Sequence, residues 1–482
     1  MEIHEARSMN FSLFSTISDV TAAIRTRAIS ATELVETTLE RISVLDPKLR
    51  AFAHLEAEGA RAQARSADSA VLRDDPLGTL HGVPVTIKGN IDVAGLPCPA
   101  GSLLRKDYVP QHNAPLVARL RAAGAIILGN TNTPEFLMAY ESNNLLIGKT
   151  SNPWDLSRTP GGSSGGEAAA IASGCSFGGV GSDGGGSIRV PAHFSGICGL
   201  KPTPGRVPST GHFPPGAGLL SWLGVVGPMA RTIADVRALF EVLAGPDPGD
   251  ALSAPVPFQN VEANVRLKGL RVGLLESSAL LKATPETEAA VKKAASLLAD
   301  QGFAVEPFQL SELDRALEIW WFFFGPVVAH LFAPTIEGHE EQLSSILREY
   351  IAYAAPENPL TLDALFLACA ARDNVRAEIL RQLRDVPILL SPVSSSPAFR
   401  HGEGTYRMDS PHCYRTSMRH SQWLNLAGCP GASVPVGVSP EGLPIGVQVI
   451  GRPYEEELVL AVAECIERAR GPWQAPPFKV PL

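Results

Sequence analysis

From residue 161 to residue 186 the chain is unusually rich in glycine and serine. Such composition is typical of a flexible linker, but residues 167–172 (EAAAIA) favour a helix inside the stretch. The glycines therefore do not indicate a linker. Ser187 directly follows the last three of them, where backbone N–H groups lack side-chain cover. Uncovered N–H groups beside a hydroxyl nucleophile are how an oxyanion hole is built.

Apolar runs alternate with amphipathic stretches along the chain. Ser30 and Glu33 have the spacing of a capping box and predict the start of a helix that ends at Pro47. The apolar patterns predict strands at residues 83–87, 125–128 and 270–275, and helices at residues 116–123 and 285–301. This alternation favours an α/β sheet with a parallel component.

Lys88 directly follows the apolar run VPVTI. Desolvation lowers a lysine pKa from about 10.4 towards roughly 7 to 8, the range that suits a general base. A serine alone is a weak nucleophile and needs such a partner. Local sequence leaves open that Lys88 is a solvated surface lysine, and that Ser163 and Ser187 belong to ordinary glycine-serine turns.

Three segments together resemble the amidase signature family. They are VPVTIKGNIDVAG around Lys88, TPGGSSGGEAAAIASG around Ser163 and GVGSDGGGSIRVPAHFSGICGLKPT around Ser187. Their separations of 75 and 24 residues are those expected of the family's lysine, cis-serine and nucleophile. The similarity covers nearly the whole chain and is weakest between about residues 260 and 380.

The resemblance implies one large amidase signature domain over residues 1–482, an α/β fold with a central twisted mixed β-sheet flanked by helices. The catalytic core would span residues 65–250, and a variable substrate-pocket region residues 260–400. Ser187 would attack the carbonyl, and Ser163, placed before a cis peptide bond, would relay the proton to neutral Lys88.

The resemblance also assigns supporting residues. Ser164 would assist the relay, while Asp183 and Arg189 would orient the nucleophile or form a plain structural ion pair. The oxyanion would be held by the backbone N–H groups of Gly184, Gly185, Gly186 and Ser187. Gly184 is a departure, because family members usually carry a side chain there, and the loop or pocket could be roomier.

The expected substrates are small, largely apolar amides, including anilides and carbamates (urethanes). The aromatic run at residues 320–324 is either a core helix or one wall of an apolar pocket, to which Trp320 and Trp321 would contribute. By resemblance to the family, Met138 and Tyr140 lie near the catalytic groups.

Several alternatives stay open. Within the family, the rival is the A subunit of a glutamyl-tRNA amidotransferase; Glu167 after GGSSGG, and a central region without a lysine-rich helix, favour a free-standing hydrolase instead. Gly161, Ser163 and Gly165 also fit the GxSxG elbow, with a histidine from His401, His412 or His420. A GxGxxG match at residues 179–184 lacks the expected helix, and a non-catalytic scaffold would not need all three catalytic residues.

Composition limits which binding partners and which cellular compartment we expect. The net charge is −8 and no basic run stands out, so we expect no nucleic-acid ligand. The seven cysteines lack CxxC pairs, which predicts reduced thiols, no metal and a cytoplasmic protein without a cofactor. We expect no secretory signal, no transmembrane segment at residues 319–335, where two prolines and a histidine interrupt the apolar run, and a monomer or homodimer.

Overall fold

The computed structural model describes residues 12–216, 218–261, 267–275, 281–355 and 360–477. Its centre is an eleven-stranded sheet in the order β1-β3-β2-β6-β8-β7-β12-β13-β11-β9-β10. The strands are β1 (Phe52–Leu55), β2 (Pro84–Lys88), β3 (Ile126–Thr131), β6 (Gly178–Asp183), β7 (Cys198–Lys201), β8 (Val225–Ala230), β9 (Arg271–Leu275), β10 (Ala304–Phe308), β11 (Ile388–Pro392), β12 (Gly431–Val438) and β13 (Pro444–Gly451). The short strands β4 (Asn143–Asn144) and β5 (Gly148–Lys149) form a separate ribbon.

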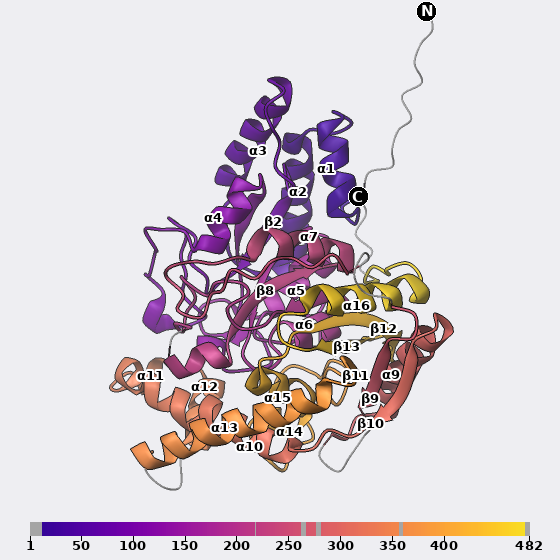
Figure 1. Cartoon of the computed structure of the whole chain (residues 1–482). Helices are drawn as coiled ribbons and strands as arrows, with labels where there is room; N and C mark the ends of the chain where they lie inside the picture. The colour runs from indigo at the N-terminus through magenta and orange to yellow at the C-terminus, as the bar shows by residue number, and fades with distance from the viewer. Residues whose placement is uncertain (1–11, 217, 262–266, 276–280, 356–359, 478–482) are drawn as a thin grey trace, which may run out of the picture.

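Helices flank the sheet. They are α1 (Ile17–Arg25), α2 (Ala31–Leu49), α3 (Ala57–Leu72), α4 (Pro115–Ala122), α5 (Gly165–Ala172), α6 (Arg189–Ser195), α7 (Ile233–Leu243), α9 (Pro285–Asp300), α10 (Leu313–Phe322), α11 (Val328–Ile336), α12 (Ser345–Ala354), α13 (Leu362–Leu383), α14 (Tyr414–Ser417), α15 (Arg419–Ala427) and α16 (Glu456–Arg470). Short 3₁₀ helices are η1 (Leu103–Arg105), η2 (Glu135–Leu137), η3 (Gly218–Trp222) and η5 (Glu340–Gln342), and η4 (Phe323–Val327) is a π-helix. Figure 1 shows α1 to α4 at one end of the molecule and α10 to α15 at the other.

The predicted α/β fold is confirmed, and the sheet is mixed. Strand β2 pairs in parallel with both β3 and β6, and β9 pairs in parallel with β10 and β11. The pairs β6–β8, β7–β8 and β12–β13 are antiparallel. Because β2 has neighbours on both sides and all five of its residues are buried, the candidate base Lys88 lies deep in the sheet.

The predicted start of α2 is confirmed and its predicted end is wrong. Ser30 and Glu33 form the capping box, in which each side chain accepts the backbone N–H of the other residue. The helix continues through Pro47 to Leu49 and ends at Arg50, whose backbone is left-handed. A proline removes only its own N–H from the last turn, so the helix extends for two further residues.

The other predicted elements are found with small shifts at their ends. Strand β2 includes Lys88, which the prediction placed after the strand. Strand β3 runs three residues beyond the predicted end, and α5 begins two residues before residue 167. At these ends the backbone hydrogen bonds to strands or loops that are distant in sequence, and a local pattern does not reveal such partners.

The apolar run at residues 319–335 belongs to a continuous helical stretch. Among the described residues this stretch, Leu313–Ile336, has the length and composition to cross a membrane, but 44% of its apolar 18-residue window is buried inside the protein. Its first helix, α10, packs against α13 and α15. Such packing is that of a core helix.

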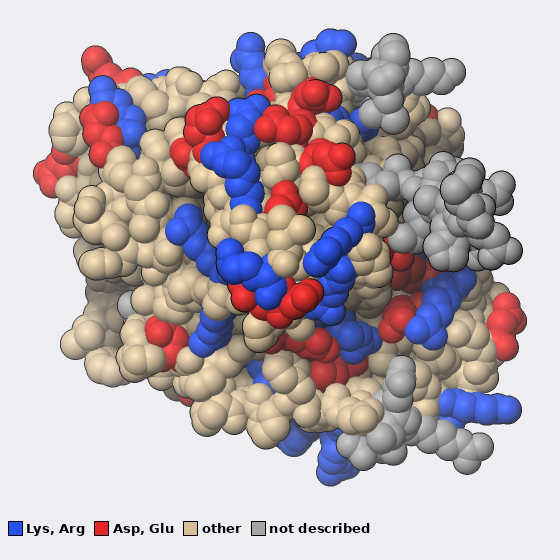
Figure 2. All heavy atoms as spheres, turned by 90° about the horizontal axis from the view of Figure 1, so that it is seen from above, with Lys and Arg blue, Asp and Glu red and all other residues tan. Residues whose placement is uncertain are grey.

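Charges of both signs cover the end of the molecule formed by α1 to α3. Figure 2 shows Lys and Arg interspersed with Asp and Glu on this face. The pairs include Arg61 with Glu36 and Arg73 with Asp75. The described residues of this face therefore form no single-sign patch of the kind that binds phosphates.

Candidate active site

Lys88 occupies the last position of β2 and is fully buried. Its Nζ lies 2.7 Å from Oγ of Ser163 and 2.9 Å from Oγ of Ser182. Burial lowers the pKa of Lys88 well below its ordinary value, although the negative charges of Asp183 and Glu167 oppose the shift. A lysine of this kind is neutral at a much lower pH than usual and can accept a proton from Ser163 across the 2.7 Å contact.

Ser163 lies between the cis peptide bond and the start of α5. The peptide bond between Gly162 and Ser163 is cis, so the cis bond precedes Ser163, whereas our prediction placed it after that residue. Helix α5 starts two residues later. The hydrogen-bond partner of Ser163 is Lys88, whereas a GxSxG elbow would present a histidine.

Ser164 supports the neighbouring strand. Its Oγ donates to the carbonyl oxygen of Ser182 and accepts the N–H of the same residue, both at 3.3 Å. Its backbone N–H donates to the carbonyl oxygen of Ser187 at 3.2 Å. Ser164 thereby connects the segment of Ser163 to the segment of Ser187.

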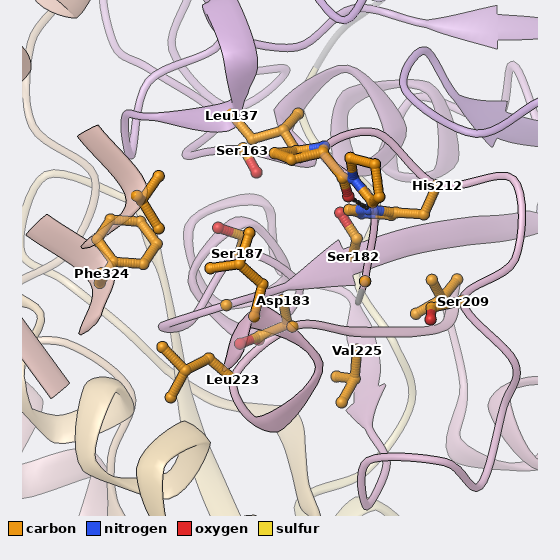
Figure 3. Close-up of a pocket in the computed structure, with 18 of the residues that line it drawn as sticks. Leu137, Ser163, Ser182, Asp183, Ser187, Ser209, His212, Leu223, Val225 and Phe324 are labelled. Carbon is orange, nitrogen blue, oxygen red and sulfur yellow. Dashed lines mark hydrogen bonds between the residues drawn. The ribbon is translucent and has the colours of Figure 1, made fainter. Parts of the chain in front are cut away.

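Ser187 follows β6 and the three glycines and faces a cavity (Figure 3). Ser163, Ser182 and His212 line the same cavity. The remaining lining is largely apolar and includes Leu137, Met138, Leu220, Leu223, Val225, Val226, Phe324 and Val328. A serine, a bridging serine and a buried amine around one cavity are the parts that nucleophilic catalysis of acyl transfer needs.

Asp183 and Arg189 form a fully buried ion pair with an N–O distance of 2.9 Å. Burial alone would raise the pKa of Asp183, but the charge of Arg189 and its hydrogen bonds hold the pKa below the ordinary value. The carboxylate also accepts the backbone N–H of Gly186 at 2.7 Å and that of Ile188 at 3.1 Å. Arg189 in turn donates to Oδ1 of Asn425 at 2.7 Å. The pair fixes the backbone on both sides of Ser187.

This pairing changes the predicted oxyanion hole. The N–H of Gly186 already donates to Asp183, so Gly186 has no free N–H for an oxyanion. The candidate donors that remain from the prediction are the N–H groups of Gly184, Gly185 and Ser187. Gly185 also has no room for a side chain, because a Cβ there would lie 2.5 Å from the ring of Trp320.

The predicted pocket residues divide into two groups. Met138 lines the cavity, as does Phe324 from the predicted aromatic run. Tyr140 and Trp320 instead hold the glycine loop: the Tyr140 hydroxyl donates to the carbonyl oxygen of Gly185 at 2.7 Å, and Nε1 of Trp320 donates to that of Gly184 at 2.9 Å.

Trp321 lies in another environment. Its ring packs 4.2 Å from the guanidinium of Arg415 and contacts the ring of Tyr406. Trp320 is 2% exposed, in agreement with the interpretation of a core helix, while Phe324 supplies the wall of the cavity. The aromatic run therefore contributes Trp320 to the core and Phe324 to the cavity wall.

Two residues of the site were missed by sequence reasoning. Ser182 lies within hydrogen-bond distance of Lys88 because β6 runs parallel to β2, a register that no local pattern reveals. His212 reaches the cavity from a loop 124 residues after Lys88. The sequence offered no signal for either residue beyond the proximity of Ser182 to the glycine loop.

Glu167, which in the sequence favours a free-standing hydrolase, has a structural role. It is fully buried and lies between Thr86 of β2 and Thr131 of β3, with Oγ1 of Thr131 donating to it at 2.8 Å. Burial raises the pKa of its carboxyl to about 8 against these hydrogen bonds. A carboxyl that links two core strands carries no information about substrates or partners.

A family model, sequence relatives and a solved structure were each found to be similar to this chain. The family model described as Amidase matches residues 33–460. The chain is 37% identical to the A subunit of the glutamyl-tRNA(Gln) amidotransferase of Roseiflexus castenholzii, over 91% of this chain and 92% of that protein. It is 36% identical to the corresponding protein of Anaeromyxobacter sp. (strain K), over 95% and 96%. The solved structure of 6-aminohexanoate cyclic dimer hydrolase superposes with a TM-score of 0.86, at 27% identity over 97% of this chain and 99% of that chain.

These comparisons correct two expectations. The prediction of a free-standing hydrolase of small apolar amides, anilides or carbamates is wrong, because the curated relatives at 34–37% identity are amidotransferase A subunits. The prediction of a monomer or homodimer without a nucleic-acid partner is wrong for the same reason. The first rested on Glu167, which is a core residue, and on the lack of a lysine-rich helix in the central region. The second rested on the net charge of the chain and the lack of a basic run.

Proposed function

Because this chain belongs to the amidase family, we propose that it cleaves the C–N bond of carboxamides through an acyl-enzyme on Ser187, as the A subunit of a glutamyl-tRNA amidotransferase. The observation that carries the chemistry is the 2.7 Å contact between Nζ of the buried Lys88 and Oγ of Ser163, which lines the same cavity as Ser187. The observation that supports the assembly is similarity to A subunits along nearly the whole chain.

In the first half of the reaction, neutral Lys88 takes the proton of Ser163, which takes the proton of Ser187 as the Ser187 oxygen bonds to the carbonyl carbon. The N–H groups of Gly184, Gly185 and Ser187 hold the developing oxyanion. The C–N bond then breaks, and the proton returns through Ser163 to the leaving nitrogen. A primary carboxamide releases ammonia, and Ser187 is left as an ester.

In the second half, water replaces the leaving nitrogen and the same groups act in the same order. Lys88 takes a proton of the water through Ser163, the hydroxide oxygen attacks the ester carbonyl, and Ser187 leaves with its proton restored. The products are a carboxylic acid and ammonia. In an amidotransferase the ammonia is the useful product, since it converts an activated carboxylate of the acceptor into an amide.

The test of the chemistry is ammonia release from L-glutamine and L-asparagine by the purified chain, with Ser187→Ala as the matched inactive variant. We expect release by the parent and none by the variant. Equal release by both proteins would overturn the role of Ser187.

The test of the assembly uses the other amidotransferase subunits of Roseiflexus castenholzii, whose own A subunit is the positive control. This chain should copurify with them and convert glutamyl-tRNA(Gln) to glutaminyl-tRNA(Gln) in a glutamine-dependent manner. Hydrolysis of amides without association, while the control protein associates and transfers, would refute the assembly and leave the amidase chemistry standing.

A further inference from the structure

The catalytic cavity contains a histidine for which the proton relay has no use. His212 lies in the loop between β7 and β8 and lines the cavity together with Ser163, Ser182 and Ser187. Figure 3 shows its ring beside Ser182, on the side of the cavity away from Phe324.

The backbone around His212 is fixed to the segment that follows Lys88. Residues Ile91 and His212 form a β-bridge, and the N–H of Phe213 donates to the carbonyl oxygen of Asn90 at 2.9 Å. The side-chain amide of Asn90 donates back to the carbonyl oxygen of Phe213 at 2.8 Å. The His212 imidazole therefore belongs to a segment that pairs with Asn90 and Ile91, two and three residues after Lys88.

The hydrogen bonds of the ring determine its tautomer. Nδ1 lies 2.7 Å from the carbonyl oxygen of Pro214, which can only accept, so Nδ1 carries the proton. Burial lowers the pKa of His212 to about 4 against this hydrogen bond, so the ring is neutral near pH 7. Nε2 of a neutral ring with a protonated Nδ1 is an acceptor only.

That acceptor is buried, and no partner for it is found among the described residues. A buried polar atom without a hydrogen bond costs about 1 to 3 kcal/mol, so a bound molecule that donates to it gains that contribution. Of the two ends of a scissile amide, only the nitrogen carries a hydrogen to donate. The nitrogen must also face Ser163, which returns the proton to it, and Ser163 shares the cavity with His212.

We propose that Nε2 of His212 accepts a hydrogen bond from the N–H of the scissile amide, and that this contact makes the site selective for amides that bear an N–H over esters of the same acid. The inference rests on the proposed amide cleavage at Ser187. An ester oxygen has no hydrogen to donate, so it would leave Nε2 unpaired. His212 is thus a specificity-determining residue that contacts the leaving group and leaves the relay from Ser187 to Lys88 unchanged.

The experiment compares kcat/KM for L-glutamine and for L-glutamate γ-methyl ester, which share the γ-glutamyl acyl group, and repeats the comparison with acetamide and methyl acetate. The variants are His212→Asn, which can still donate to Pro214 but does not reach the position of Nε2, and His212→Gln, which places an amide oxygen near that position. Ser209→Ala, another polar residue that lines the cavity, is the control.

We expect His212→Asn to lower kcat/KM for the amides about 10- to 100-fold and for the esters less than about 3-fold, in keeping with one lost buried hydrogen bond. His212→Gln should restore much of the amide-to-ester ratio, and Ser209→Ala should leave the ratio unchanged. An equal loss on amides and esters in His212→Asn would overturn the inference while leaving the proposed function intact. A parent that cleaves no amide in either pair would overturn both.

Discussion

Nζ of Lys88 and Oγ of Ser163 lie 2.7 Å apart although 75 residues separate them in sequence. Lys88 is held by the centre of the sheet, and Ser163 by the loop that leads into α5. The contact is shielded from solvent on both sides, since Lys88 is 0% and Ser163 1% exposed. A proton can therefore pass between them without competition from bulk water.

The first prediction concerns the base. Because Lys88 must be neutral to accept a proton, the rate should rise with pH through an apparent pKa well below the ordinary lysine value of 10.5. Lys88→Ala should remove this rise of the rate with pH and lower the rate at least about 100-fold. Lys88→Arg should be no better, because arginine stays protonated. Steady-state rates from about pH 6 to 10 provide the measurement, and near-parental activity of Lys88→Arg would show that Lys88 is a charge anchor.

The second prediction concerns the nucleophile. Ser187→Ala should abolish covalent labelling by a fluorophosphonate, whereas Ser163→Ala should slow labelling but keep it at Ser187. Mass spectrometry of the labelled peptide distinguishes the two serines, and the thermal midpoint checks that both variants are folded. A label on Ser163 would mean that the GxSxG interpretation is correct.

The third prediction concerns the buried ion pair. Removing one partner leaves the other charge buried without compensation, so Arg189→Met should lower the free energy of unfolding by about 3 to 5 kcal/mol. The pKa of Asp183 is lower in the folded chain than its ordinary value of 3.8. Its contribution to stability is therefore complete above pH 3.8 and is lost as the pH falls through the folded value.

Denaturant unfolding at several pH values below 7 tests this linkage. Asp183→Asn should be less stable than the parent at pH 7 and should lack the part of the acid sensitivity that Asp183 causes. A variant as stable as the parent at pH 7 would show that the ion pair contributes nothing net.

The fourth prediction concerns the glycine loop. Tyr140→Phe and Trp320→Phe each remove a donor to a loop carbonyl, at Gly185 and Gly184 respectively. We expect kcat to fall about 10-fold with little change in KM, because the loop carries oxyanion donors that act in the transition state. Trp473→Phe, which loses a similar hydrogen bond to the carbonyl oxygen of Gly196 outside the loop, is the control. A change confined to KM would instead indicate that the two rings contact substrate.

The fifth prediction concerns cofactors. A serine mechanism of this kind uses only side chains and backbone N–H groups, so exhaustive treatment with a chelator should leave the rate of amide cleavage unchanged. The rate before and after treatment, and after addition of zinc or magnesium, is the measurement. Activity lost on chelation and regained with metal would contradict the mechanism.

Local sequence was sufficient for some elements of the site. The run VPVTI predicted a buried strand beside Lys88, and the glycines before Ser187 predicted an uncovered backbone, because both signals lie within a few residues of the functional group. Ser182 and His212 could not be found in this way. They join the site through the pairing of β2 with β6 and of Ile91 with His212, which depends on the whole fold.

The choice between a free-standing hydrolase and an A subunit failed for a related reason. Both share the catalytic residues, and the residue used to separate them, Glu167, links β2 to β3 in the core. The lack of a lysine-rich helix in the weakly similar central region was the other argument, and it did not separate the two classes either. Similarity along the whole chain carried the information that single residues did not.

The ion pair of Asp183 and Arg189 also affects when, during synthesis, the chain can become active. Arg189 is held by Asn425 of α15 and by Gln448 of β13, at N–O distances of 2.7 and 2.9 Å. During synthesis, Lys88, Ser163 and Ser187 all emerge more than 200 residues before these two partners. Until they arrive, Arg189 lacks these two partners, so we expect a nascent or truncated chain to carry Lys88, Ser163 and Ser187 and still to hydrolyse amides far more slowly than the complete fold.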